Sequence, residues 1–129
     1  MKSIICGMCA ISLVVFLPGC PTGPSQDDLR TTGVHEYQVG HHERAMEMFQ
    51  RVLRSDPSDA VSLFYMGRIY HTQKLYIKAY YYYQAAIDAD PGFGYAEATK
   101  RYLKEVKQEL GDLADTLTTN PKQTEHPVP

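Results

Sequence analysis

A recurrence at one fixed spacing is the feature that most restricts how this chain can fold. Within the stretch Ala60 to Pro91, six residues match in type the residue found 34 positions earlier, a spacing that we call the repeat offset. The pairs, earlier member first, are Leu29 and Leu63, Gly33 and Gly67, Ala45 and Ala79, Phe49 and Tyr83, Val52 and Ala86, and Pro57 and Pro91. Small and large residues that return in the same order at this spacing are typical of an array of helix–turn–helix repeats. The alternative is a pair of unrelated helical hairpins whose residues align by chance.

The glycines and prolines of this pattern predict where helices approach each other and where they end. Gly33 and Gly67 have no side chain and let a neighbouring helix come close, at a cost of ~1 kcal/mol in helix propensity relative to alanine. Proline cannot continue a helix and restricts the residue before it, so Asp56-Pro57 and Asp90-Pro91 close the two repeats. We expect helices over about residues 27–39, 43–54, 59–72 and 75–89.

These positions resemble the tetratricopeptide repeat family, over residues 26–91. The resemblance implies an all-α fold with two helix–turn–helix repeats, residues 26–57 and 60–91, stacked as a right-handed α-solenoid. Three positions depart from the family pattern. The family usually has leucine at Thr32 and an aromatic residue at Glu36, and it usually has glycine at Lys74, where the first repeat keeps Gly40.

A further amphipathic helix is expected at residues 94–115. Its apolar residues follow one another in steps of three and four, and they include Tyr95, Ala98, Tyr102, Val106, Leu110 and Leu113. Charged residues replace the small and apolar ones of the repeat, since Glu97, Lys100 and Arg101 stand at the offsets of Leu63, Met66 and Gly67. We therefore interpret this segment as a capping helix, followed by a disordered tail at 116–129. Three repeats are normally needed for a continuous core, so this cap, a second copy or a partner has to complete it.

The N-terminal segment is typical of a signal peptide. Lys2 precedes an apolar run from Ile4 to Leu17, shorter than the ~20 residues of a spanning helix. The run ends in Leu17-Pro18-Gly19-Cys20, which resembles the bacterial lipoprotein signal and implies removal of residues 1–19 and lipidation of Cys20. An uncleaved anchor or an ordinary signal peptide is the alternative. Residues 20–25 then form a linker, and Pro21, which is not aspartate, favours the periplasmic face of the outer membrane.

Several classes of function have no support in the residues. A net charge of −2 with mixed signs provides no basic face for nucleic acid. His35-Glu36 begins like a zinc-protease motif, but Val39 stands where the second histidine is needed. His41 and His42 are adjacent and would point about 100° apart on a helix, so they do not share a metal easily. Since phosphate-loop and nucleophile motifs are also missing, we expect no enzyme, no metal and no cofactor.

In the tetratricopeptide family, the inner face of the first helix of each repeat lines a concave channel. The resemblance assigns this channel to Arg30, Val34, Tyr37 and Gln38 in the first repeat, and to Val61, Phe64, Tyr65, Arg68, His71 and Thr72 in the second. The aromatic residues would anchor a bound protein or peptide, and Arg30 and Arg68 would bond its carboxylate or backbone groups. The alternative is a channel filled by the C-terminal helix of the chain or by a second copy.

Tyr81 differs from the other tyrosines of the run Tyr80 to Tyr83, because its counterpart in the first repeat is the charged Glu47. We expect Tyr81 to be exposed on the convex side, where an aromatic residue can anchor an interface. Packing against the capping helix is the alternative.

Together these features predict a lipid-anchored scaffold or assembly factor of the bacterial cell envelope. The resemblance suggests a role in pilus, secretion or outer-membrane assembly, through a protein or peptide partner and with membrane attachment by the N-terminal lipid. A homodimer is compatible with the short array. The second hypothesis is a structural envelope subunit that associates with itself and has no foreign peptide ligand.

Overall fold

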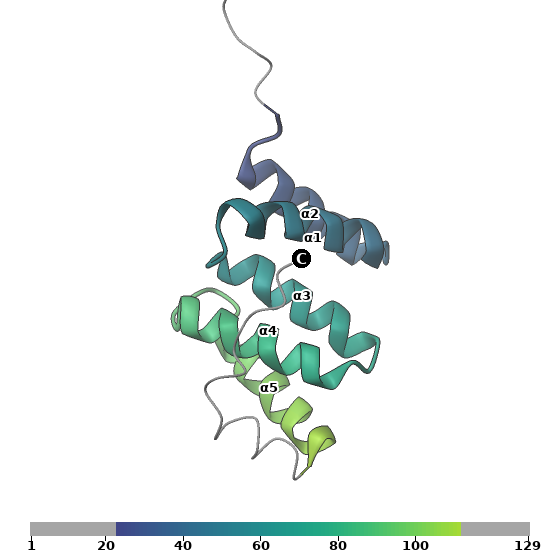
Figure 1. Cartoon of the computed structure of the whole chain (residues 1–129), viewed down its shortest axis with the longest axis vertical. Coiled ribbons are helices and arrows are strands. Elements are labelled where there is room, and N and C mark those ends of the chain that lie inside the picture. The colour runs from purple at the N-terminus through teal and green to yellow at the C-terminus, as the bar shows by residue number, and fades with distance from the viewer. Residues whose placement is uncertain (1–22, 112–129) are drawn as a thin grey trace, which may run out of the picture.

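A computed structural model describes residues 23–111, and these residues form five α-helices with no strand among them. The helices are α1 (Gln26–Gln38), α2 (His42–Ser55), α3 (Ala60–Thr72), α4 (Tyr76–Ala89) and α5 (Ala96–Leu110). They stack in chain order along the long axis of the molecule, with α1 and α2 at one end and α5 at the other (Figure 1). The predicted all-α class is confirmed. The predicted signal peptide, Cys20 and the tail at 116–129 lie outside the described residues.

The second hairpin copies the first at the repeat offset. Both bounds of α3 and of α4 follow the corresponding bounds of α1 and α2 at this same spacing. The residues that end the helices also correspond, since Val39 and Gln73 have φ of −86° and −80°, and Asp56 and Asp90 have φ of −135° and −150°. The helix bounds lie within about one residue of those expected from sequence.

Each hairpin begins at a side-chain cap in the same place. Ser25 Oγ accepts a hydrogen bond from the Asp28 N–H at 3.1 Å, and the Asp28 carboxylate accepts one from the Ser25 N–H at 3.1 Å. In the second hairpin, Asp59 Oδ2 accepts from the Ser62 N–H at 2.8 Å. These caps satisfy N–H groups that have no partner within the first turn of a helix.

The two glycines of the pattern lie at equivalent close approaches between helices. A Cβ added to Gly33 would lie 2.8 Å from the ring of Phe49, and a Cβ added to Gly67 would lie 2.6 Å from the ring of Tyr83. Both rings are fully buried. The predicted role of these glycines in helix packing is confirmed, because no side chain fits in either place without a shift of the facing ring.

Each of the two turns inside the hairpins contains one residue in the left-handed backbone conformation. Gly40 has φ of +86° and Lys74 has φ of +59°. Glycine adopts this conformation freely, whereas a residue with a Cβ pays roughly 1–2 kcal/mol. Lys74 is therefore a strained substitute for the glycine of the first hairpin.

Helix α5 begins at Ala96, two residues after the predicted start, and ends at Leu110, five residues before the predicted end, where Gly111 has φ of +55°. The cap positions Ser25 and Asp59 correspond to Phe93, whose side chain has no oxygen to accept from an N–H and is instead buried in the core. The helix consequently starts later, after Tyr95, without a side-chain cap. Val106 is fully buried, so α5 closes the core as the predicted cap would.

Candidate protein-binding surface

The stripe predicted on α1 and α3 is divided into a buried part and an accessible part. Phe64 and Tyr65 are only 3% and 7% exposed, so the prediction that they anchor a ligand is wrong. Tyr95, the residue before α5, stacks on Phe64 with centroids 4.9 Å apart and meets Tyr65 edge-on at 5.7 Å. Tyr65 also stacks on Phe49 of α2, with centroids 5.3 Å apart. The residue that precedes the C-terminal helix thus covers this part of the predicted stripe.

Arg68 lies at the accessible part, between rings from two other helices. Its guanidinium is centred 4.2 Å from the Tyr102 ring of α5 and 5.8 Å from the Tyr37 ring of α1. Arg68 Nη1 also donates a hydrogen bond to the Tyr102 hydroxyl. Among residues 23–111, no carboxylate forms an ion pair with Arg68. The guanidinium has five N–H donors, and the bond to Tyr102 is made by one of its two terminal nitrogens.

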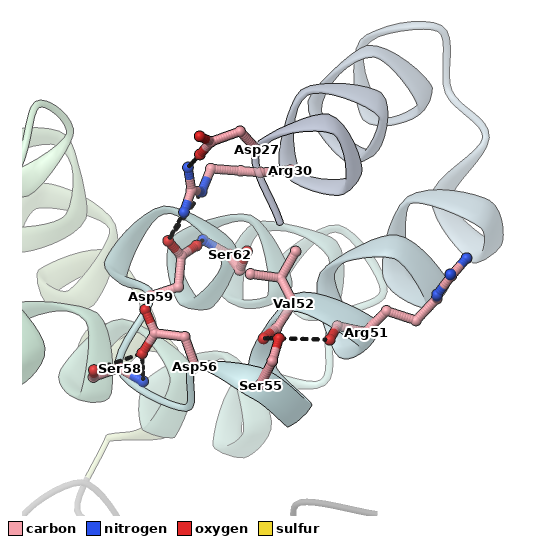
Figure 2. A network of polar contacts seen from close by, with 9 residues as sticks. All are labelled: Asp27, Arg30, Arg51, Val52, Ser55, Asp56, Ser58, Asp59 and Ser62. Atoms are coloured by element: carbon pink, nitrogen blue, oxygen red, sulfur yellow. Dashed lines mark hydrogen bonds and ion pairs between the residues drawn. The ribbon is translucent and has the colours of Figure 1, made fainter. Parts of the chain in front are cut away.

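Arg30, the other arginine of the predicted stripe, bonds carboxylates of its own chain. Its Nε donates to Asp59 Oδ1 at 2.9 Å, its Nη2 lies 2.6 Å from the same oxygen, and its Nη1 lies 2.6 Å from Asp27 Oδ1 (Figure 2). The prediction that Arg30 meets a carboxylate was chemically sound, but the carboxylate belongs to the N-terminus of α3. Arg30 therefore joins α1 to α3 in the folded chain.

Asp59 is the centre of this polar network, because it caps α3 and pairs with Arg30 at once (Figure 2). Burial alone would raise the pKa of Asp59, but the hydrogen bonds from Arg30 and Ser62 outweigh burial and hold the pKa of this carboxyl below its ordinary value. The same contacts with Asp59 and Asp27 raise the pKa of Arg30. The carboxylate of Asp59 is thus held in its charged form, in which it both caps α3 and pairs with Arg30 of α1.

The remaining predicted residues lie on α1 and α3 and are half-buried or exposed. Tyr37 is half-buried and stacks on His42, with centroids 5.4 Å apart. His71 is half-buried, and its Nδ1 lies 3.3 Å from the Tyr83 hydroxyl. Thr72 is exposed and donates to the Ile69 carbonyl at 2.7 Å. Val61 is half-buried. An open depression on α1 is lined by Arg30, Thr31, Val34, His35 and Gln38.

The tyrosine run of α4 is largely part of the core. Tyr80 and Tyr83 are buried, and Tyr82 stacks on Tyr70 at 5.3 Å, where burial raises the pKa of Tyr82 to about 12. Tyr81 is half-buried and meets Tyr80 edge-on at 5.7 Å. The expectation of a freely exposed Tyr81 is therefore wrong, because the neighbouring core covers part of its ring.

Tyr95 and Tyr102 belong to this surface, although their apolar period predicts only a place on the packing face of the cap. A signal for them exists, since they follow Val61 and Arg68 at the repeat offset. Arg101 stands at the glycine position of this segment and breaks the repeat pattern there, which obscures the correspondence of the two tyrosines.

No group of three metal-ligating side chains gathers anywhere between residues 23 and 111. None of the helices in this range has both the length and the apolar character needed to cross a bilayer. Comparison of the chain with protein-family models, with curated proteins and with solved structures gives no match.

Proposed function

We propose that this chain is a tetratricopeptide-type scaffold that binds a protein or peptide partner at the surface formed by Tyr37, Arg68 and Tyr102. The agreement of helix bounds, caps and glycine contacts at the repeat offset supports the repeat assignment. The chain acts in this proposal by binding and not by catalysis.

The observation that carries the binding proposal is the contrast between the two arginines. Arg30 is satisfied by two carboxylates, whereas Arg68 has aromatic neighbours and no acidic partner among the described residues. Aromatic faces hold a guanidinium in place without neutralising it. A partner that offers a carboxylate would add charge-assisted hydrogen bonds to Arg68 and apolar contact to the rings beside it.

The test uses a cross-linker at Thr72, which is exposed one helical turn after Arg68. With a photo-cross-linkable amino acid at this position, the full chain in its native cells should form a discrete adduct with one partner. Arg68→Gln should reduce this adduct at least tenfold. Arg101→Gln, which removes an exposed charge from α5, should leave it unchanged, and the helical circular dichroism of both variants should match the parent. An adduct that survives Arg68→Gln would disprove binding at this surface.

We further propose that the scaffold is anchored to a bacterial envelope membrane by lipid on Cys20. Lipoproteins with this signal carry several acyl chains, and two or more chains anchor a protein stably. Labelling with a palmitate analogue should mark the parent chain and should be lost in Cys20→Ala. A parent chain that takes up no label contradicts the anchor and leaves the proposal for Arg68 untouched.

A further inference from the structure

We propose that the turn between α3 and α4 contacts the surface of an anionic lipid bilayer. This turn, the α3–α4 tip, comprises Lys74, Leu75, Tyr76, Ile77 and Lys78. Leu75 and Ile77 are each 44% exposed, so two aliphatic side chains face solvent where the chain reverses direction. The proposal goes beyond partner binding at Arg68 and does not depend on it.

The first hairpin shows that the backbone of the turn does not require aliphatic residues here. His41 and Leu75 precede α2 and α4 with almost the same conformation, φ and ψ of −83° and 67° against −87° and 65°. Glu43 stands in the first hairpin where Ile77 stands in the second. Because the same turn forms with histidine and glutamate, the folding of the turn does not explain the exposed Leu75 and Ile77.

The charged residues on the stretch of chain that includes the α3–α4 tip have one sign. Between Asp59 and Asp88 the chain has no aspartate or glutamate, although its net charge is −2. Lys74 and Lys78 flank the two aliphatic residues, and neither forms an ion pair with a described residue. Lys78 Nζ lies 5.1 Å from the centre of the Tyr70 ring, a contact that leaves its charge in place.

The corresponding tip of the first hairpin carries charges of both signs. Glu36 lies 2.8 Å from His41 Nδ1 and 3.8 Å from Arg44 Nη1, and Glu43 adds an exposed negative charge. The two tips lie on the same edge of the molecule, where both hairpins turn (Figure 1). One edge of the fold thus carries a tip of mixed charge, where Val39 is the exposed aliphatic residue, beside a cationic tip with two exposed aliphatic residues.

A bilayer fits the second tip better than a protein groove does. The aliphatic side chains lie at a convex chain reversal, so a protein partner would need a matching cavity with an acidic rim. A bilayer provides apolar depth and negative headgroups without any matched shape. Each lysine near an anionic surface gains roughly fivefold in partitioning, so the pair contributes roughly 25-fold.

The chain has no tryptophan, which allows a single fluorescent probe at the tip. In full-length Leu75→Trp, reconstituted in vesicles of phosphatidylglycerol and phosphatidylethanolamine, we expect a blue-shifted emission that lipids brominated in their acyl chains quench. His41→Trp places the same probe at the equivalent position of the first tip and should show neither effect. Vesicles of pure phosphatidylcholine should leave both probes unquenched.

A charge-removal variant tests the role of the lysines. Adding Lys74→Gly and Lys78→Gln to Leu75→Trp should reduce quenching at least tenfold at limiting anionic lipid. Lys74→Gly is suited to this purpose, because Gly40 holds the same left-handed position in the first hairpin. Quenching that is absent, equal in phosphatidylcholine, or equal for both probes would overturn the proposal. A blue shift that depends on protein concentration and not on lipid would overturn it in favour of contact between two copies.

Discussion

The hairpin α1–α2 and the hairpin α3–α4 follow the same backbone path but use their side chains differently. The first begins at an exposed Ser25–Asp28 capping box and turns through a glycine. The second begins at the buried Asp59, bonded to Arg30, and turns through a lysine in a left-handed conformation. The cap of the second hairpin is therefore also bonded to Arg30 of the first, whereas the cap of the first involves only Ser25 and Asp28.

This difference separates the residues that make the hairpin from those that place it in the stack. Positions where a side chain would collide, such as Gly33 and Gly67, are the same in both hairpins because helix packing at short distance permits no alternative. Positions at the cap and the tip differ because water, a neighbouring helix or an external partner can satisfy them. The following predictions compare matched positions in the two hairpins.

The largest effect is expected for Gly67→Ala. The added Cβ would lie 2.6 Å from Cδ1 of Tyr83, a fully buried ring stacked on Tyr102. We expect a loss of about 3 kcal/mol in the free energy of unfolding, measured with urea. Gly33→Ala should cost less, because its closest contacts, at 2.8 and 3.0 Å, involve the outer atoms of the Phe49 ring.

A second substitution that makes room should partly rescue Gly67→Ala. The double variant Gly67→Ala with Tyr83→Leu should lose less free energy of unfolding than the sum of the losses in the two single variants, because the smaller side chain removes the collision. Strictly additive losses would mean that the collision at Gly67 does not cause the destabilisation.

Asp59→Ala is expected to cost about 2 kcal/mol, because α3 loses its cap and Arg30 loses its buried partner. The matched change, Ser25→Ala, removes a solvent-exposed cap and should cost about 1 kcal/mol. Urea unfolding of both variants measures the difference. Equal losses would show that the contact with Arg30 adds no stability to the second hairpin.

The same carboxyl predicts a pH dependence. Since its pKa is lowered in the folded chain, Asp59 contributes stability that is fully present above its unfolded pKa of about 3.9 and is lost as the pH falls through the lower, folded pKa. The free energy of unfolding should therefore fall below about pH 4. In Asp59→Asn, this decline should be shallower than in the parent, and a parallel decline would contradict the assignment.

The smallest effect, and the only stabilising one, is expected for Lys74→Gly. Replacing a left-handed lysine with glycine should relieve about 1 kcal/mol of strain, so the urea midpoint should rise. The reverse change in the first hairpin, Gly40→Lys, should cost a similar amount. A loss of stability in Lys74→Gly would show that its side chain makes a contact that outweighs the strain.

Much of the secondary structure was predictable from local chemistry. Proline, the capping residues and the apolar period placed four helices to within about one residue of their observed bounds. The start of α5 was predicted too early, because Phe93 replaces the cap that the repeat has at Ser25 and Asp59. The roles of Arg30, Phe64 and Tyr65 could not be predicted from their own helices, since residues far along the chain, on α3 and α5, decide them.

The sequence alone determined the hairpin, its period and the two glycines, because these depend on steric limits that act within a turn or between helices joined by a short turn. Only the tertiary structure decided which channel residues are accessible. That outcome depends on where α5 packs, because Tyr95 at its start covers Phe64 and Tyr102 within it contacts Arg68. Burial is a property of the whole stack, and no single helix specifies it.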